Sequence, residues 1–420
     1  MYSLLLAIIY LAFVSLGLPD SLVGAGWPVM HADLGVPVSF AGIITMIIAG
    51  GTILSSLASE RVTKRFGAGV VTAVSVGLTA AALVGFSVSG SFWLLCLWAI
   101  PYGLGAGAVD AALNNYVALH FAARHMNWLH SFWGLGASIS PFIMSYALTS
   151  GLGWSSAYRI VGVAQAVLTV VLIASIPLWG KVRPAPEAEH PAEHTDAAEP
   201  PGGGRSHVPL ATALRIPGVL LILAAFFAYC ALESTAILWA STYLVTDRGV
   251  DSATAAAFAS LFLLGITAGR FLAGFFADRV GDKRLIRGGF AVVALAVVLI
   301  ALPVGTPVPA LVGLVIAGLG CAPIYPAIIH STPANFGARS SQAIIGIQMA
   351  AAYTGSTLAP PAFGVLSAWV GAWVFPLFLA VLVALGLLMS ERLNRLVARR
   401  GDEPDQGATA GAVGAAERRG

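Results

Sequence analysis

The sequence predicts an all-α integral membrane protein, with twelve transmembrane helices in two pseudo-symmetric halves of six. Composition is the first reason: 58% of the 420 residues are hydrophobic and 10% are charged, whereas soluble domains carry about 25% charged residues. So few charges cannot cover a water-soluble surface, so the surface must face lipid. The second reason is that apolar runs of about 20 residues, enough to cross a bilayer, recur along the chain. The third is that segments of the first half return in the second.

The individual helices follow from apolar runs between polar or Gly/Pro breaks. These runs predict spans near residues 3–29, 38–58, 69–89, 91–119, 128–150, 157–180, 215–245, 253–276, 286–304, 308–332, 341–367 and 370–391. The first run starts at Met1 without a basic region or a small-residue cleavage site. We therefore expect it to be a retained helix rather than a signal peptide.

The two halves are separated by residues 181–214, which are rich in Pro, Ala, Glu, His and Gly and poor in apolar residues. This composition predicts a flexible cytoplasmic linker. It divides an N-terminal six-helix bundle, residues 1–180, from a C-terminal one, residues 215–391. Residues 392–420 predict a disordered cytoplasmic tail.

The basic residues predict the orientation of the chain, because cytoplasmic loops retain Lys and Arg. With the N-terminus inside, all of the 22 Lys and Arg residues except Arg159 and Arg248 lie on the cytoplasmic side. We therefore expect a multi-pass protein of the inner (plasma) membrane with both termini in the cytoplasm. The net charge of +3 is too small to indicate nucleic acid as a partner.

Three pairs of segments repeat at a nearly constant offset between the halves. They are Glu60-Arg61 with Asp278-Arg279, Gly103-Leu104-Gly105 with Gly318-Leu319-Gly320, and Asp20-Ser21 with Glu233-Ser234. Duplicated halves place the substrate path at the interface between them, near the midplane of the bilayer.

Three acids, Asp20, Asp110 and Glu233, lie well inside apolar spans and among helix-interrupting or polar residues. A carboxylate at that depth costs about 2.5–3.5 kcal/mol on insertion scales. Arg159 and Arg270 lie near the ends of their spans, so we expect no cation deep enough to pair with the acids. Acids without a cation should bind and release protons, the chemistry of a proton-coupled carrier. The alternative is that they cap helices or hydrogen-bond to broken backbone.

Polar and aromatic side chains near these acids are candidates for contact with a solute. Asp110 and Asn114 are four residues apart and share a helix face, so they can present a carboxylate and an amide together. The predicted substrate-binding residues are Asn114, Asn115, Trp27, Trp239, Gln348 and Tyr325. Helix-to-helix hydrogen bonds and an interfacial aromatic belt are the alternatives for these residues. His130 and His330 lie near the predicted cytoplasmic ends and are interpreted as gate or capping residues.

Residues 269–284 read Gly-Arg-Phe-Leu-Ala-Gly-Phe-Phe-Ala-Asp-Arg-Val-Gly-Asp-Lys-Arg. This segment resembles the G-x-x-x-D-R-x-G-x-K/R signature of the major facilitator superfamily. The resemblance implies the major facilitator fold and a cytoplasmic gating motif of Gly269, Arg270, Asp278, Arg279 and Lys283. The copy in the first half contains Glu60 and Arg61, but Ser56 and Thr63 stand where glycines are usual.

Two further segments resemble the fucose permease-like group of sugar:proton symporters within that superfamily. They are Leu18-Pro19-Asp20-Ser21 through Gly26-Trp27-Pro28, and Gly107 through Asn115 with Leu129-His130-Ser131-Phe132-Trp133. The resemblance implies that Asp20 and Asp110 carry proton coupling and sugar contact, with Asp in place of the usual Glu on the fourth helix. Glu233 has no counterpart in that group.

These observations predict a secondary transporter working by alternating access, a proton-coupled symporter of a small, polar, sugar-like solute. Aromatic and amide side chains suit hydroxyl-rich rings, and the expected absence of a deep cation argues for a neutral solute. A proton-antiport exporter of a drug or metabolite is the alternative, and Na+ could replace H+ because carboxylates also bind it. We expect a monomer that is not an enzyme, with no metal and no cofactor, since no nucleotide, metal or catalytic motif is present.

Overall fold

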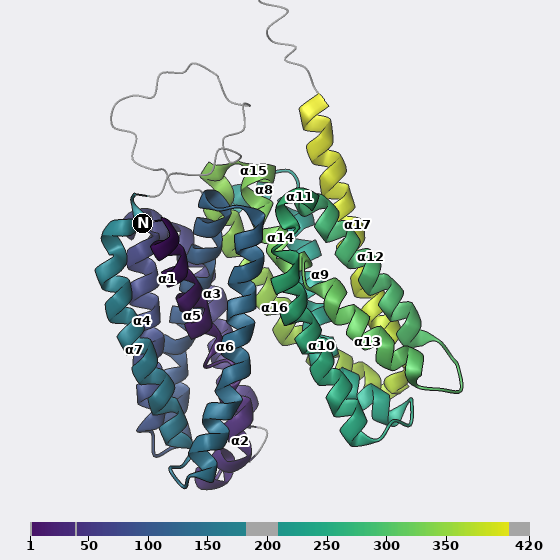
Figure 1. Ribbon diagram of the computed structural model, residues 1–420, viewed down its shortest axis with the longest axis horizontal. Coiled ribbons are helices and arrows are strands. Elements are labelled where there is room, and N and C mark those ends of the chain that lie inside the picture. The colour runs from purple at the N-terminus through teal and green to yellow at the C-terminus, as the bar shows by residue number, and fades with distance from the viewer. Residues whose placement is uncertain (1, 38–39, 182–208, 403–420) are drawn as a thin grey trace, which may run out of the picture.

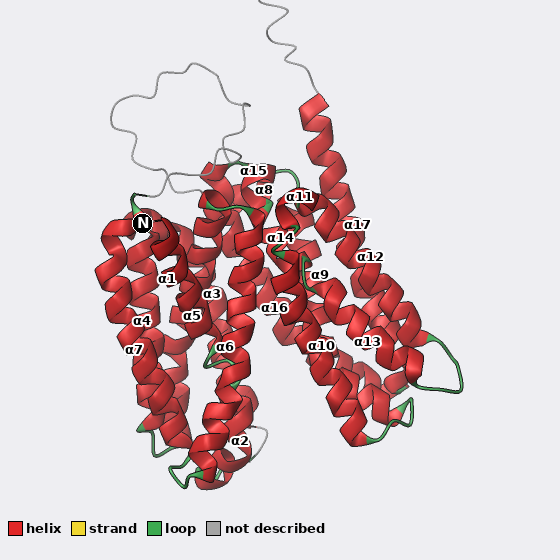
Figure 2. Cartoon of the chain, viewed as in Figure 1, coloured by secondary structure: helices red, strands yellow, loops and turns green. Residues whose placement is uncertain are grey.

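The computed structural model describes residues 2–37, 40–181 and 209–402, and these contain helices and no β-strand (Figures 1 and 2). The first half contains α1 (Tyr2–Gly17), α2 (Leu22–Asp33), α3 (Ala41–Phe66), α4 (Ala68–Ser87), α5 (Phe92–His120), α6 (Ala123–Thr149) and α7 (Trp154–Trp179). The second contains α8 (Leu210–Arg215), α9 (Val219–Thr246), α10 (Ser252–Ala273), α11 (Ala277–Val280), α12 (Asp282–Ala301), α13 (Val308–Cys321), α14 (Ile324–His330), α15 (Thr332–Phe336), α16 (Ala338–Val370), a 3-10 turn (Ala372–Val374) and α17 (Phe375–Asp402).

Two groups of six membrane-length segments confirm the predicted architecture. By length and composition, nine stretches of the described residues are apolar enough to cross a membrane. Helices α6, α10 and α16 complete the two sets, and all three carry polar or charged side chains that face the interface between the halves. These polar side chains lower the mean hydropathy of the three helices, so hydropathy alone does not select them as membrane spans.

The packing repeats between the halves as the sequence pairs predicted. Helix α1 packs on α6, α3 on α5 and α4 on α7, and the corresponding pairs in the second half are α9 on α16, α10 on α13 and α12 on α17. The repeated glycines make the same contact in each half. A Cβ on Gly103 would lie 2.4 Å from the Ile48 carbonyl oxygen, and one on Gly318 would lie 2.3 Å from that of Phe262. Glycine lets the helices approach this closely.

Two predicted spans are interrupted. The first breaks between Gly17 and Leu22, so Asp20 lies on a turn between α1 and α2, and the tenth breaks before Pro323. Proline lacks an amide hydrogen and cannot complete the helical ladder, which accounts for both breaks. The breaks matter because Asp20 lies in the first of them and Tyr325 follows the second directly.

The C-terminal boundary also differs from the prediction. Helix α17 continues to Asp402, past the predicted end at residue 391. Glu391 accepts hydrogen bonds from Arg287 Nε at 2.7 Å and Nη2 at 2.6 Å, which ties this extension to α12. Most of the predicted linker, residues 182–208, and the tail from residue 403 lie outside the described residues, while the end of the linker segment forms α8.

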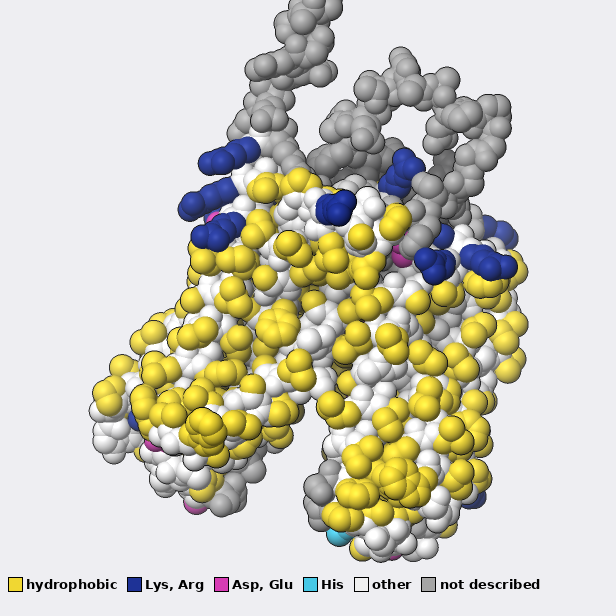
Figure 3. Space-filling model, turned by 180° about the vertical axis from the view of Figure 1, so that it is seen from behind, with side chains coloured by type: hydrophobic (Ala, Val, Ile, Leu, Met, Phe, Trp, Pro, Cys, Tyr) yellow, Lys and Arg dark blue, Asp and Glu magenta, His cyan; other side chains and the backbone are white. Residues whose placement is uncertain are grey.

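The two halves meet at the end of the molecule that carries most of the Lys and Arg side chains, which we call the basic end; it includes Arg61, Lys64, Arg124, Arg279 and Lys283. Figure 3 shows Lys and Arg side chains gathered at one end and the two halves parted by a hollow at the opposite end. Helix α3 packs on α16, and α6 on α10. Hydrogen bonds that join the halves link Ser341 Oγ to Asn115 Oδ1 (2.6 Å), Gln342 Nε2 to Ser59 Oγ (3.2 Å), Arg124 N to Asp278 Oδ1 (2.9 Å) and Trp128 Nε1 to the Phe271 carbonyl (3.2 Å).

The crossing of α1 and α6 gives a first testable prediction. A Cβ on Gly136 would lie 2.1 Å from the Val14 carbonyl oxygen, so Gly136→Ala must push the helices apart. Overpacking costs about 1–3 kcal/mol, and backbone cannot yield as a flexible side chain does. We expect a lower melting temperature in detergent, measured by fluorescence-detected size exclusion after heating. Gly50→Ala on α3, where a Cβ meets nothing within 4 Å, is the control. Equal melting temperatures for both variants would contradict the prediction.

Candidate functional site

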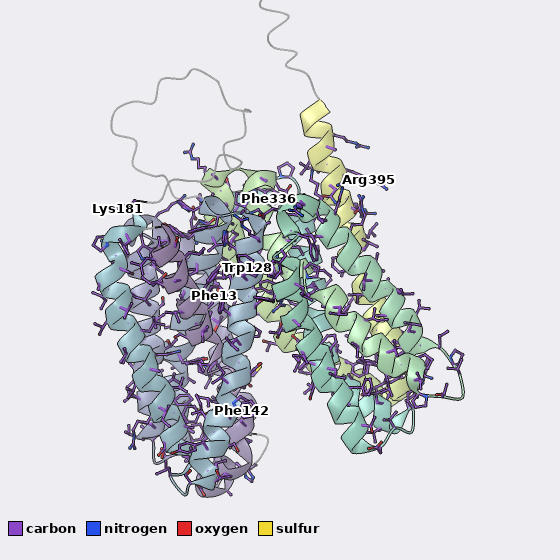
Figure 4. The ribbon with its side chains drawn as sticks, viewed as in Figure 1. Phe13, Trp128, Phe142, Lys181, Phe336 and Arg395 are labelled. Atoms are coloured by element: carbon purple, nitrogen blue, oxygen red, sulfur yellow. The ribbon has the colours of Figure 1, made fainter. Side chains whose placement is uncertain are left out.

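A cavity of about 340 Å³ lies between the halves. Its size is at the lower end of the range of about 300–1,000 Å³ for small-molecule sites. Helices α1 to α7, with the break after α1, line one side, and α9, α10, α14 and α16 line the other. The lining is mostly apolar, and its hydrogen-bonding or charged members are Asp20, Thr45, Thr52, Tyr102, Asp110, His130, Trp133, Tyr158, Glu233, Ser234, Arg270, Tyr325, Tyr353 and Ser356. Figure 4 labels Phe13, an apolar member of the lining, and Trp128 at the junction of the halves.

Asp20 projects into the cavity from the turn between α1 and α2. The Tyr102 hydroxyl donates to Oδ1 at 3.1 Å, and Trp133 Nε1 donates to Oδ2 at 2.9 Å. The helix break frees this position from the α-helical ladder, and the close α1–α6 crossing brings Trp133 alongside. Asp20 is thus held by two neutral donors from α5 and α6.

Asp110 lies deeper, with 5% of its surface exposed. Asn114 Nδ2 donates to Oδ1 at 2.7 Å, and Tyr353 on α16 donates to Oδ2 at 2.9 Å. Because the Asn114 amide nitrogen faces Asp110, its oxygen faces His130 Nε2 at 3.0 Å, so that ring nitrogen carries the hydrogen. The carboxylate is therefore bonded to both halves of the protein at once.

Glu233 and Arg270 overturn the expectation that no cation reaches this depth. Arg270 Nη2 lies 3.2 Å from Glu233 Oε1 and 3.3 Å from the Tyr229 hydroxyl, and the guanidinium lies 5.8 Å from the Tyr325 ring centroid. The sequence places Arg270 near the end of its helix and inside the gating signature. The prediction was wrong because depth counted along a helix ignores the length of an Arg side chain, which turns inward to meet Glu233. The expected absence of a deep cation therefore no longer supports a neutral solute.

Of the predicted substrate-binding residues, only Tyr325 lines the cavity. Asn114 lies behind it and positions Asp110. The other four lie outside the cavity lining, and each side chain has a structural partner elsewhere. Asn115 accepts from Ser341 at the basic end, Trp27 stacks edge-on against Phe92, Trp239 donates to the Pro360 carbonyl, and Gln348 accepts from Thr332.

The predicted gating residues lie at the basic end, with Arg270 the exception. Asp278 joins Arg124 of the other half, with 3.4 Å between Nε and Oδ2. Glu60 pairs with Lys64 at 2.6 Å, and Arg61 lines a small surface pocket beside α8. A Cβ on Gly269 would lie 2.6 Å from that of Ala322, so this glycine does allow close packing. Arg279 and Lys283 have no ion-pair partner among the described residues.

The two histidines interpreted as gate residues lie in different parts of the structure. His130 lies in the cavity lining, bonded to Asn114, so that interpretation was wrong for it. His330 lies between Asp282 Oδ2, at 2.7 Å from Nδ1, and the Phe121 carbonyl of the other half, at 3.3 Å from Nε2. His330 therefore bridges the halves at the basic end.

Sequence reasoning missed Tyr102 and Trp133 as partners of Asp20, and Tyr353 as the partner of Asp110. For Tyr102 a signal was available: Tyr102, Ala106 and Asp110 are spaced by four residues and share one face of α5. All three line the cavity. Trp133 and Tyr353 lie on helices far away in the sequence, and only the fold brings them to the acids.

Comparisons with known proteins fit this geometry. The family model of the Major Facilitator Superfamily matches residues 9–266 and again 221–415. "Bypass of stop codon protein 6" of Saccharomyces cerevisiae is 24% identical over 64% of this chain and 56% of its own length. The 4-hydroxybenzoate transporter PcaK of Acinetobacter baylyi is 22% identical over 91% of this chain and 88% of its own.

Among solved structures, the E. coli fucose:proton symporter FucP in its outward conformation superimposes with a TM-score of 0.73. The alignment covers 92% of this chain and 98% of FucP at 16% identity, so it shows the fold alone. Family model, fold and repeated halves agree: the chain belongs to the Major Facilitator Superfamily, a family of membrane transporters and not of enzymes.

Proposed function

We propose that this transporter is a proton-coupled symporter of a small, polar, sugar-like solute, working by alternating access. The observation that carries the proposal is the pair of cavity acids Asp20 and Asp110. Within the described residues, neither has a basic hydrogen-bonding or ion-pair partner; their donors are Tyr102, Trp133, Asn114 and Tyr353. In a largely apolar cavity, a proton neutralises such an acid at lower cost than desolvating its charge.

The position of Asp110 supports a link between protonation and movement. Its carboxylate, on α5, accepts the Tyr353 hydroxyl from α16. The hydrogen bond to an ionised acceptor is stronger than one to a neutral acceptor. Loss or gain of a proton on Asp110 therefore changes the strength of a contact between the halves, which is what coupling requires.

The distribution of charge supports an outward-facing conformation. Basic residues concentrate at the closed end, and the positive-inside rule favours the cytoplasm for that end. The cavity then opens to the outside, where a symporter meets its solute and its proton. By the same argument, both termini lie on the cytoplasmic side of the membrane.

The lining and the relatives support a ring that carries hydroxyl groups. Phe13, Tyr102, Trp133 and Tyr325 offer aromatic faces, and the acids accept hydrogen bonds from hydroxyls. Fucose and 4-hydroxybenzoate, the solutes in the names of FucP and PcaK, are both hydroxylated rings.

Reconstitution tests the proposal directly. Purified protein in liposomes is given an inward proton gradient and a panel of labelled hydroxylated ring compounds. We expect one or more to accumulate above the outside concentration, and the accumulation to collapse with a protonophore. Equal accumulation from a sodium gradient at matched pH would contradict proton coupling.

A proton-antiport exporter is the second candidate, and the apolar part of the lining, including Phe13, Leu16, Val23, Ile48 and Ile237, favours it. The same liposomes distinguish the two. An antiporter would use the inward proton gradient to empty preloaded liposomes, whereas a symporter would fill them.

A further inference from the structure

The pair of Glu233 and Arg270 has no part in the coupling proposed for Asp20 and Asp110. Both side chains line the cavity, and both belong to the second half, on α9 and α10. Arg270 is nearly inaccessible, with 4% of its side chain exposed, whereas Glu233 has 15% exposed. A buried charge is retained in a membrane protein where it serves a solute or ion path.

Only some of the hydrogen-bond donors of the Arg270 guanidinium have a partner. In the described part of the chain, Nη2 alone has hydrogen-bond partners, Glu233 Oε1 and the Tyr229 hydroxyl, and Nε is buried without one. Arginine and carboxylate groups usually pair through two parallel hydrogen bonds. An ion pair that served packing alone would use that geometry, because an unpartnered buried donor is costly. Arg270 thus has hydrogen-bonding capacity that its contacts among the described residues do not use.

We propose that Arg270 binds a carboxylate of the transported solute, and that the Glu233 carboxylate pairs with Arg270 when no solute is bound. The inference rests on the proposed transport function and narrows it: the solute is a hydroxylated monocarboxylate, with the acid group on Arg270 and hydroxyl groups toward Asp20 and Asp110. Such a solute contacts both halves, since Arg270 lies on the second and the two aspartates on the first. Alternating access needs a ligand that both halves recognise.

Replacement of Glu233 by the solute carboxylate on Arg270 can also leave the total charge of the site unchanged. When the solute carboxylate binds the guanidinium, Glu233 loses its cation. A proton that enters with the solute anion keeps the total charge of the site equal to that of the original ion pair. The ionisable groups around the pair of Glu233 and Arg270 are Tyr229, Cys230, Cys321, Tyr325 and the imidazole His130, which is bonded to Asn114, with Asp110 across the cavity. Arg270 is the one Lys or Arg among the pair and these groups, so no other group there replaces it.

The test compares acids with their neutral counterparts on the purified, full-length protein, by isothermal titration calorimetry. The pairs are D-gluconate with D-glucitol and D-glucuronate with D-glucose. We expect at least one acid to bind about tenfold or more tightly than its neutral partner, the effect of a charged hydrogen bond. Tighter binding of the neutral partners, or no binding of either acid, overturns the inference.

Two variants separate recognition from a structural ion pair, because they are expected to act in opposite directions. Arg270→Gln should lose acid binding by about tenfold or more. Glu233→Gln should tighten it, because a competing carboxylate is gone. An ion pair that only holds α9 against α10 would weaken binding in both variants. The double variant Glu233→Gln/Arg270→Gln, which leaves no buried charge unpaired, should fold and still fail to bind the acid.

The binding measurements are independent of coupling. If the acids bind but no proton gradient moves them, the proposed symport fails and the recognition stands. If neutral sugars accumulate with protons while acids do not bind, the symport stands and the recognition fails.

Discussion

Replacement of Asp110 by asparagine is expected to abolish proton-driven accumulation while leaving exchange of solute across the membrane. Asparagine can still accept the Tyr353 hydroxyl and fill the same volume, but it takes up no proton. A gradient of about two pH units supports at most about a hundredfold accumulation for each proton carried. We expect that ratio to drop to about one in proteoliposomes, with counterflow of labelled solute retained.

The controls for this variant separate the acid from its contacts. Asp110→Glu keeps a titrating group and should keep accumulation. Tyr353→Phe removes the 2.9 Å hydrogen bond between the halves without removing the acid, and should lower the accumulation ratio in part, because that bond links protonation of Asp110 to movement of the halves. Full accumulation by Asp110→Asn would contradict the assignment of Asp110 to coupling.

The acids were predictable because a carboxylate in an apolar run is costly wherever the helix points. The break beside Asp20 had a local signal in Gly17 and Pro19, although the sequence analysis predicted one unbroken span, 3–29, there. The repeated glycines and the six-plus-six layout followed from local patterns that the fold reproduces in each half.

The departures of the structure from the sequence expectations have two physical causes. Helices such as α5 and α9 are apolar around most of their circumference, so periodicity does not reveal which face meets the cavity. Asn115 and Trp239 therefore looked equal to Asn114 and Tyr325 as candidates. Arg270 was misplaced because its backbone lies near a helix end while its guanidinium reaches Glu233. Depth of the charged atom, rather than of its Cα, decides whether an ion pair forms.

The closed basic end gives the other large expected effect, at Gly346 on α16. A Cβ there would lie 2.5 Å from the Ser56 carbonyl oxygen on α3 of the opposite half. A valine at this position overlaps backbone only while the basic end is closed. The variant should therefore disfavour the closed arrangement by about 1–3 kcal/mol, a population shift of about 5–150-fold.

Gly346→Val should consequently lower net transport strongly and expose the interface at the basic end. A reporter cysteine at Ser341, which is fully buried between the halves, measures this with a membrane-impermeant maleimide in inside-out vesicles. We expect fast labelling with Gly346→Val and slow labelling without it. Gly288→Val is the matched control, since a Cβ at that glycine on α12 meets nothing within 4 Å.

The direction of the effect distinguishes a gate from a general packing site. A residue that only stabilised the fold would lower melting temperature and transport together, with labelling spread over buried positions. A gate residue leaves each six-helix half intact and changes access at one end alone. Unchanged labelling of the Ser341 reporter in folded Gly346→Val protein would show that the halves part by a different route. It would also remove the α3–α16 contact from the closing surface.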